Sequence, residues 1–249
     1  MPAAPLALTM GEPGGVGAEI AIKAWTALRT SGPCFFLIDD PARLEGLGAN
    51  VARIGTPREA GAAFETALPV LDIGAKVSAR PGTADPAHAP HVLASIERAV
   101  ALALTGAASG VVTNPVQKSA LAASGFKFPG HTEYLAALTA NAPMPAQRRR
   151  GTVMMIAGPG LRTVPLTIHT PLTGVPAAIS RDLIISTGII VIEALKHDFG
   201  VRNPRLAVAG LNPHAGEGGA IGAPAAIANA VNDALSPFAV SIDEIPITP

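Results

Sequence analysis

The stretch LALTMGEPGGVGAEIAIKAWTAL, residues 6–28, indicates the fold class, because an apolar run leads through a glycine-rich turn into a longer helical pattern. The same succession recurs along the chain and is typical of α/β layering with a mostly parallel sheet. The pattern predicts strands at 6–10, 34–38, 68–73, 110–113, 153–157, 163–168 and 205–211. It predicts helices at 16–28, 89–105, 116–123, 133–140 and 181–199.

Two stretches rich in proline and glycine, residues 78–90 and 142–151, interrupt this pattern. We take the second as the crossover between two lobes, which predicts a first α/β lobe at 1–145 and a second at 146–249. In the helix predicted at 181–199, apolar residues occur nearly all round. Such a helix is expected to be buried between a sheet and a partner subunit.

Composition excludes several classes of protein. The formal net charge is zero and only 14% of residues are charged, so no electrostatic footprint for nucleic acid is present. No apolar stretch reaches the roughly 20 residues that cross a bilayer, and no basic n-region of a secretory signal precedes an apolar run. Cys34 is the single cysteine, and its apolar surroundings indicate a buried small hydrophobe rather than a nucleophile. A cytoplasmic protein is expected.

The glycine-rich turn at 10–19 opens a helix, where backbone N–H groups can meet an anion. Asp39 and Asp40 close the next strand about 20 residues on, where a ribose-binding acid of a dinucleotide site would lie. The spacing is not G-x-G-x-x-G, however. A tight structural turn and a substrate-side loop are the alternatives to an NAD site here.

A second polar corner follows the strand predicted at 110–113. Asn114 and Lys118 come directly after that strand, and His131 and Thr132 precede the next helix. Donors gathered at a helix N-terminus can hold a phosphate. The alternative is that Thr132 caps the helix and His131 is a surface residue.

Two histidines each follow an apolar strand, His169 after 163–168 and His214 after 205–211. Neutral imidazoles delivered at adjacent strand ends are good ligands for a divalent metal. Two ligands are not enough for a site, and a lone histidine at a strand end is often a structural residue. The two readings stay open on pattern alone.

Taken together and in this order, these segments resemble the 4-hydroxythreonine-4-phosphate dehydrogenase family. The matching stretches are residues 9–17, residues 113–115 with Lys118, residues 128–133 and residues 211–219. The last two are specific, whereas the first is weaker by itself. The resemblance extends from about residue 5 to about residue 222.

The resemblance implies an isopropylmalate-dehydrogenase-like, two-lobed α/β/α fold and a homodimer with active sites at the subunit interface. It implies that His131 and Thr132 bind a small phosphorylated substrate. It also implies that His169 and His214 are two of three ligands of a divalent metal, either zinc, cobalt or magnesium. Lys118 is a candidate catalytic group, supplying charge or transferring a proton.

The reaction implied by the resemblance oxidises the secondary alcohol of 4-phosphooxy-threonine with NAD or NADP in pyridoxal phosphate synthesis. The resulting β-keto acid then loses carbon dioxide, and the metal acts as a Lewis acid. The residues that bind the nicotinamide cofactor are not identified by the sequence. Two rivals are a paralogous dehydrogenase of another phosphorylated hydroxy acid or diol carboxylate, and a catalytically silent phosphometabolite-binding protein.

Two features depart from the family pattern. The third metal ligand, a histidine in a Tyr-His-Asp-Gln-like motif from the neighbouring subunit, has no counterpart here, and residues 223–249 do not follow the pattern. Loss of one ligand reduces metal affinity, since even groups that only orient the ligands matter by roughly 10 to 100-fold. We therefore expect these 249 residues to bind metal weakly and to turn over substrate slowly or not at all.

Overall fold

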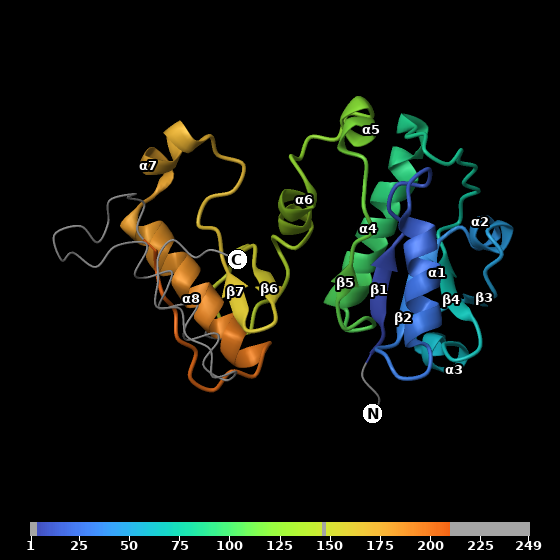
Figure 1. Cartoon of the computed structure of the whole chain (residues 1–249), viewed down its shortest axis with the longest axis horizontal. Helices are drawn as coiled ribbons and strands as arrows, with labels where there is room; N and C mark the ends of the chain where they lie inside the picture. Colours follow the sequence, from blue (N-terminus) through green and yellow to red (C-terminus); the bar gives the residue numbers. More distant parts are fainter. Residues whose placement is uncertain (1–3, 146–147, 210–249) are drawn as a thin grey trace, which may run out of the picture. The chain divides into compact units, whose positions relative to one another are not determined.

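A computed structural model describes residues 4–145 and 148–209 of the chain (Figure 1). Contacts between Cα atoms divide the chain into two units, Met1–Ala142 and Pro143–Pro249. None of the helices within the described ranges is long and apolar enough to cross a membrane.

A five-stranded sheet in the order β3-β4-β2-β1-β5 forms the centre of the first unit, and every neighbouring pair is parallel. The strands are β1 (Leu6–Thr9), β2 (Phe35–Asp39), β3 (Val51–Ile54), β4 (Leu68–Asp72) and β5 (Val111–Val112). The strands predicted at 6–10, 34–38, 68–73 and 110–113 are confirmed, and so is the α/β class. β3 was not predicted because its four residues, VARI, form neither a long apolar run nor a strict alternation.

The four helices predicted in this unit are confirmed as α1 (Gly17–Leu28), α4 (Ala89–Leu104), α5 (Lys118–Ala123) and α6 (His131–Leu138). Shorter helical segments that the sequence pattern did not predict are α2 (Pro41–Gly46), η1 (Pro57–Glu59), α3 (Ala60–Ala63) and η2 (Pro86–His88). Three of these four begin with proline, whose fixed φ suits the first position of a helix.

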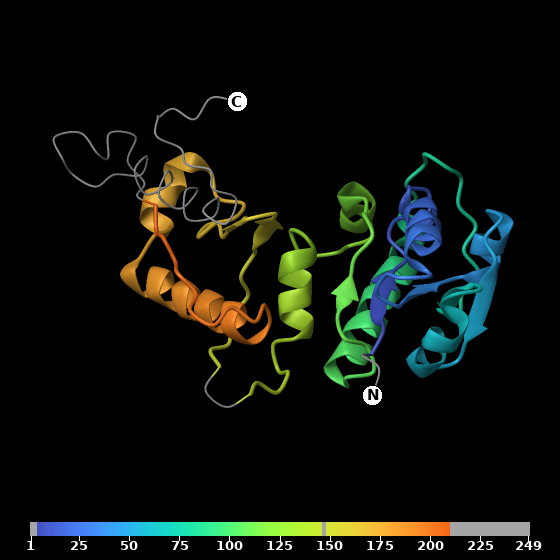
Figure 2. The ribbon, with the colours of Figure 1, turned by 60° about the horizontal axis from the view of Figure 1, so that its bottom comes forward.

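The sheet is buried on both faces, as a parallel sheet between helices must be. Alternate residues of β2 belong to different clusters: Phe35 and Leu37 pack with Trp25 of α1, whereas Phe36 and Ile38 pack in the cluster that contains Ala99 and Leu102 of α4. The helices therefore cover opposite faces of the sheet, an arrangement that can be followed from two directions in Figures 1 and 2. Cys34, half-buried, packs against both clusters, and burial raises the pKa of its thiol.

Trp25 is the only tryptophan of the chain and lies in this core. Its indole N–H donates a 2.7 Å hydrogen bond to the carbonyl of Phe64, and Phe64 in turn makes an edge-on ring contact with Phe35 at 5.1 Å between centroids. The indole is thus packed and its one donor is satisfied. Its fluorescence reports on the core of the first unit.

The second unit begins with an antiparallel hairpin of β6 (Ile156–Gly158) and β7 (Leu161–Thr163), joined by Pro159 and Gly160. Gly160 has φ 78, a conformation that glycine adopts without strain. Helical segments follow at η3 (Leu172–Gly174), α7 (Val175–Ala178) and α8 (Arg181–His197). Ser180 caps α8 by accepting a 3.1 Å hydrogen bond from the N–H of Leu183.

Strand predictions were less accurate here than helix predictions. α8 confirms the helix predicted at 181–199, and Val191 and Leu195 are its buried residues. The strands predicted at 153–157 and 163–168 were wrong over most of their residues. The chain turns back through Gly158-Pro159-Gly160 to form the hairpin, and Pro165 lacks the backbone N–H that pairing with a neighbouring strand requires. Residues 205–209 are not a strand either, and residues 210–211 of that prediction lie outside the described residues.

Candidate functional site

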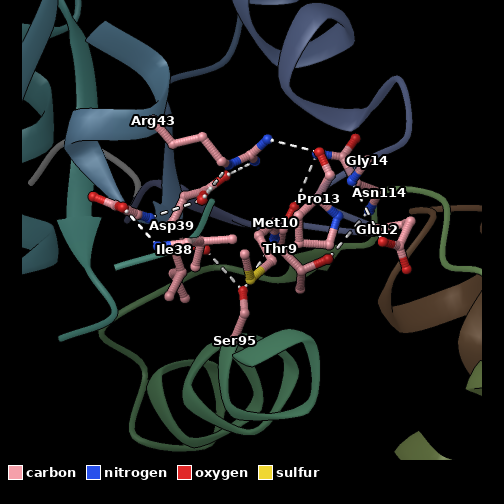
Figure 3. A network of polar contacts seen from close by, with 12 residues as sticks. Thr9, Met10, Glu12, Pro13, Gly14, Ile38, Asp39, Arg43, Ser95 and Asn114 are labelled. Atoms are coloured by element: carbon pink, nitrogen blue, oxygen red, sulfur yellow. Dashed lines mark hydrogen bonds and ion pairs between the residues drawn. The ribbon is translucent and has the colours of Figure 1, made fainter. Parts of the chain in front are cut away.

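The glycine-rich turn between β1 and α1 is held by hydrogen bonds to neighbouring segments and by others within the turn (Figure 3). The N–H of Met10 donates to Ser95 Oγ at 3.0 Å, and the N–H of Glu12 donates to the carbonyl of Pro115 at 2.8 Å. Within the turn, the Glu12 side chain accepts from the Gly14 N–H at 3.3 Å and the Glu12 carbonyl accepts from the Gly15 N–H at 2.9 Å. The N–H groups of Met10, Glu12, Gly14 and Gly15 are therefore not available to an anion.

The glycines of this turn allow the backbone to approach its neighbours closely. A Cβ on Gly11, whose φ is 69, would lie 2.7 Å from the Pro115 carbonyl oxygen, and a Cβ on Gly14 would lie 2.0 Å from the Thr83 carbonyl oxygen. Both distances are below any ordinary van der Waals contact. Of the readings left open by the sequence, the tight structural turn is therefore the one that the geometry supports.

The strand order reverses between β1 and β5, which is where α/β folds commonly bind ligands. Two buried side chains fill this point. The Asn114 N–H donates to Thr9 Oγ1 at 3.2 Å, and Asn114 Nδ2 donates to the Thr9 carbonyl at 2.9 Å. Thr9 and Asn114 are 0% and 3% exposed, so the C-terminal ends of β1 and β5 are joined directly.

Asp39 and Asp40 also have structural partners. Arg43 forms an ion pair with Asp39 at 2.5 Å and donates to the carbonyl of Pro13 at 3.2 Å, which ties α2 to the glycine-rich turn. Burial raises the pKa of Asp39, and the charge and hydrogen bonds of Arg43 oppose that rise. Asp40 caps α2 and accepts from the N–H of Val77 at 2.9 Å. Neither carboxylate fits the role of a ribose-binding acid.

A buried pair that no sequence pattern predicted lies beside this turn. His88 Nδ1 is 4.0 Å from Glu12 Oε1, and His88 Nε2 is 3.0 Å from the carbonyl of Ser78. The two residues lie 76 positions apart in the sequence, and η2 brings the chain back beside the turn. Their proximity therefore depends on the tertiary fold. They connect the turn to the segment that precedes α4.

The corner predicted to bind phosphate is a helix N-terminus without a side-chain cap. α6 starts at His131, its N-cap is Gly130, and no side-chain hydrogen bond caps its first turn. Thr132 is the second residue of the helix, so the alternative in which Thr132 is the cap is wrong. His131 and Thr132 are both half-buried. The first-turn N–H groups and the positive end of the helix dipole are oriented for an anion.

Lys118 and His131 line one pocket of about 230 Å³ in the first unit. A Cβ added to Gly130 would lie 3.8 Å from Lys118 Nζ, so the ammonium group approaches the start of α6. Burial and, second, the charge of Lys118 lower the pKa of His131. The remaining wall is largely apolar and consists of Ile96, Val116, Leu121, Ala122, Phe126, Phe128, Pro129, Gly130 and Tyr134.

The two predicted metal ligands are not both described. His169 lies in the second unit, in an irregular segment after β7, where it is exposed and has φ 57. It does not directly follow a strand, so the expected placement at a strand end was wrong, whereas His214 lies outside the described residues. Across residues 4–145 and 148–209, no three His, Cys, Asp or Glu side chains form a group that could hold a metal ion.

Comparison with known proteins gives a consistent result. The sequence model of the family described as pyridoxal phosphate biosynthetic protein PdxA matches residues 36–240, which extends beyond the limit near Gly222 inferred from motifs. A 4-hydroxythreonine-4-phosphate dehydrogenase of Caulobacter vibrioides is 50% identical over 224 residues, covering 89% of this chain and 67% of the relative. One from Xanthobacter autotrophicus is 44% identical, covering 88% and 63%.

A solved structure agrees with these relatives. The 4-hydroxythreonine-4-phosphate dehydrogenase of Klebsiella pneumoniae superposes with a TM-score of 0.70 at 29% identity, covering 97% of this chain and 74% of that one. The chain spans about two thirds of the length of the curated relatives it matches. The family match over most of the chain and the 50% identity establish that the chain belongs to the PdxA family of pyridoxal phosphate biosynthetic proteins.

Proposed function

We propose that this chain acts in the NAD(P)-dependent oxidation of 4-hydroxythreonine-4-phosphate, the substrate that names its relatives. The observation that carries the proposal within the structure is the uncapped N-terminus of α6, with Lys118 and His131 lining the adjoining pocket. A phosphate monoester needs donors and positive charge, and this corner offers both.

His131, Thr132 and Lys118 have different tasks in this proposal. The ammonium of Lys118 offsets the charge of the phosphate dianion, and the Thr132 hydroxyl and first-turn N–H groups donate to its oxygens. The lowered pKa of His131 keeps its imidazole neutral near pH 7 in the free protein, so it donates from one ring nitrogen. Binding the phosphate group in this way orients the rest of the substrate for reaction.

The nicotinamide cofactor would accept the hydride that leaves the substrate's alcohol carbon. The N–H groups of Met10, Glu12 and Gly14 in the glycine-rich turn already have acceptors, so they are not available to the diphosphate of that cofactor. We therefore assign no cofactor contact to this turn.

His169 and His214 remain our proposed metal ligands: His214 lies in the family-like stretch 211–219, and His169 is implied by the resemblance as a whole. Metal titration of His169→Ala by calorimetry, compared with the matched variant His197→Ala in α8, tests the first of them without an activity assay. We also propose a homodimer and a cytoplasmic location, the latter from the single cysteine in the sequence.

Calorimetric titration with 4-hydroxythreonine-4-phosphate tests the substrate corner. Thr132→Val keeps the side-chain shape and removes one donor, so we expect affinity to fall about tenfold, as for a hydrogen bond to a charged group. Thr26→Val is the matched control. It removes an exposed hydroxyl that donates a hydrogen bond to the Ile22 carbonyl within the same helix, α1. Equal affinity of the two variants would refute the assignment. NADH formation by the wild type separates a dehydrogenase from a silent binding protein.

A further inference from the structure

Tyr134 connects the phosphate corner to the long helix α4. It lies on α6, one turn after His131, and its side chain is buried. Its hydroxyl donates a 2.5 Å hydrogen bond to Glu97 Oε1 on α4. Hydrogen bonds to a carboxylate are short and stronger than those between neutral groups. This one joins two residues that lie 37 positions apart in the sequence, on different helices.

The ring of Tyr134 is held separately from its hydroxyl. Phe126 meets it edge-on with ring centroids 5.0 Å apart, and Phe128 lies at 5.2 Å with a tilt of 46°. Both phenylalanines line the pocket that contains Lys118 and His131. The aromatic contacts fix the position of the ring, and the bond to Glu97 adds a directional constraint on α6.

The Tyr134 hydroxyl keeps its proton near neutral pH, and so it remains a hydrogen-bond donor. Burial and, second, the Glu97 side chain raise the pKa of Tyr134 far above its ordinary value. The helix that carries the acceptor is firmly placed, since α4 packs on the sheet and its Ser95 bonds to both Met10 and Ile38, whereas the Glu97 side chain itself is exposed. The start of α6 is therefore tied to the most buried helix of the unit.

We propose that Tyr134 is a positioning residue whose hydrogen bond to Glu97 sets the orientation of the first turn of α6, and with it His131 and Thr132. The role of that turn in holding phosphate rests on the proposed function. The bond itself fixes the helix whether or not a ligand is bound, so its effect on His131 can be measured in the free protein.

Four single variants of the full chain and one double variant test this role. Tyr134→Phe keeps the ring and removes the hydroxyl, and Glu97→Ala removes the acceptor. Glu97→Gln keeps an acceptor oxygen at the same place, so it should restore most of the wild-type behaviour. Arg98→Ala, at the next exposed position of α4, is the matched control for substitutions in that helix. Trp25 fluorescence checks that each variant retains the core.

The readouts are the pKa of His131 by NMR and the dissociation constant for inorganic phosphate. In Tyr134→Phe and Glu97→Ala we expect a more hydrated His131, with its pKa nearer the ordinary value, and a phosphate affinity lower by about tenfold, or about 1.4 kcal/mol. The double variant should lose no more than either single one, because both remove the same bond.

Two results would overturn different claims. If Tyr134→Phe and Glu97→Ala match Arg98→Ala in the pKa of His131, the positioning role is refuted, whatever happens to phosphate. If the wild type binds no phosphate while the pKa of His131 still responds to both variants, the positioning role stands and the proposed substrate corner fails.

Discussion

Replacing Ser95 by alanine removes a single oxygen that serves two backbone groups. Ser95 Oγ accepts from the Met10 N–H at 3.0 Å and donates to the Ile38 carbonyl at 2.8 Å, and the residue is 0% exposed. It lies between β1 and β2 just beyond the last paired residues, Thr9 and Ile38. The hydroxyl thus continues the ladder where the two strands separate.

The expected loss of stability follows from these two contacts. A buried polar group left without its partner costs about 1–3 kcal/mol, and the carbonyl costs less than the N–H because it has a second lone pair. Two effects offset part of this loss. Alanine has a higher helix propensity than serine, and the variant no longer buries a polar hydroxyl. We expect Ser95→Ala to lower the free energy of unfolding of the first unit by about 2–3 kcal/mol.

Urea unfolding followed by Trp25 fluorescence measures this change in the first unit alone. With a urea dependence of about 2 kcal/mol per molar, the midpoint should fall by about 1–1.5 M. Ser119→Ala is the matched control, since Ser119 is an exposed serine on α5. Equal midpoints for the two variants would show that the Ser95 bridge contributes nothing and that our account of the strand ends is wrong.

Three further outcomes can be measured in the same protein. Gly14→Ala places a Cβ 2.0 Å from the Thr83 carbonyl oxygen and should destabilise the first unit by about 3 kcal/mol or more in urea, whereas Gly46→Ala, with nothing within 4 Å, should not. Lys118→Gln removes the smaller cause of the lowered pKa of His131, so NMR titration should find that pKa higher than in the wild type but still below 6.5. The lowered pKa of His131 means that, near pH 6.5, the unfolded wild-type chain binds more protons than the folded one. The free energy of unfolding of the wild type should therefore fall more steeply than that of a His131→Gln variant as pH drops through about 6.5. Parallel slopes for the two proteins would contradict this sign.

The sequence predicted the first unit well because its signals are local. The apolar strands β1, β2 and β4 and the helices α1 and α4 each carry their pattern within a few residues. In the second unit, the segment 163–168 has an apolar composition that suits a strand, but Pro165 and the tight turn before Leu161 decide otherwise. A strand also needs a neighbour, and composition does not reveal whether one is present.

The candidate site was predicted only in part for the same reason. His131, Thr132 and Lys118 stand near one another in the sequence, so a motif could identify them. The Tyr134 bond to Glu97 and the Glu12 approach to His88 join segments far apart in the chain. Such contacts depend on how helices pack on the sheet, and no spacing rule within one segment predicts them.

The position of β3 at the end of the sheet has a consequence for solubility. An outermost strand offers unpaired backbone groups to any other extended chain, and this invites aggregation. β3 has only four residues, and its exposed Arg53 forms a 3.0 Å ion pair with Glu45 of the adjoining helix α2. A charge at the middle of a short edge makes it costly for another strand to add there. An exposed ion pair such as Arg53–Glu45 contributes little to folding stability. Its position on the edge strand nevertheless helps to keep separate copies of the sheet apart.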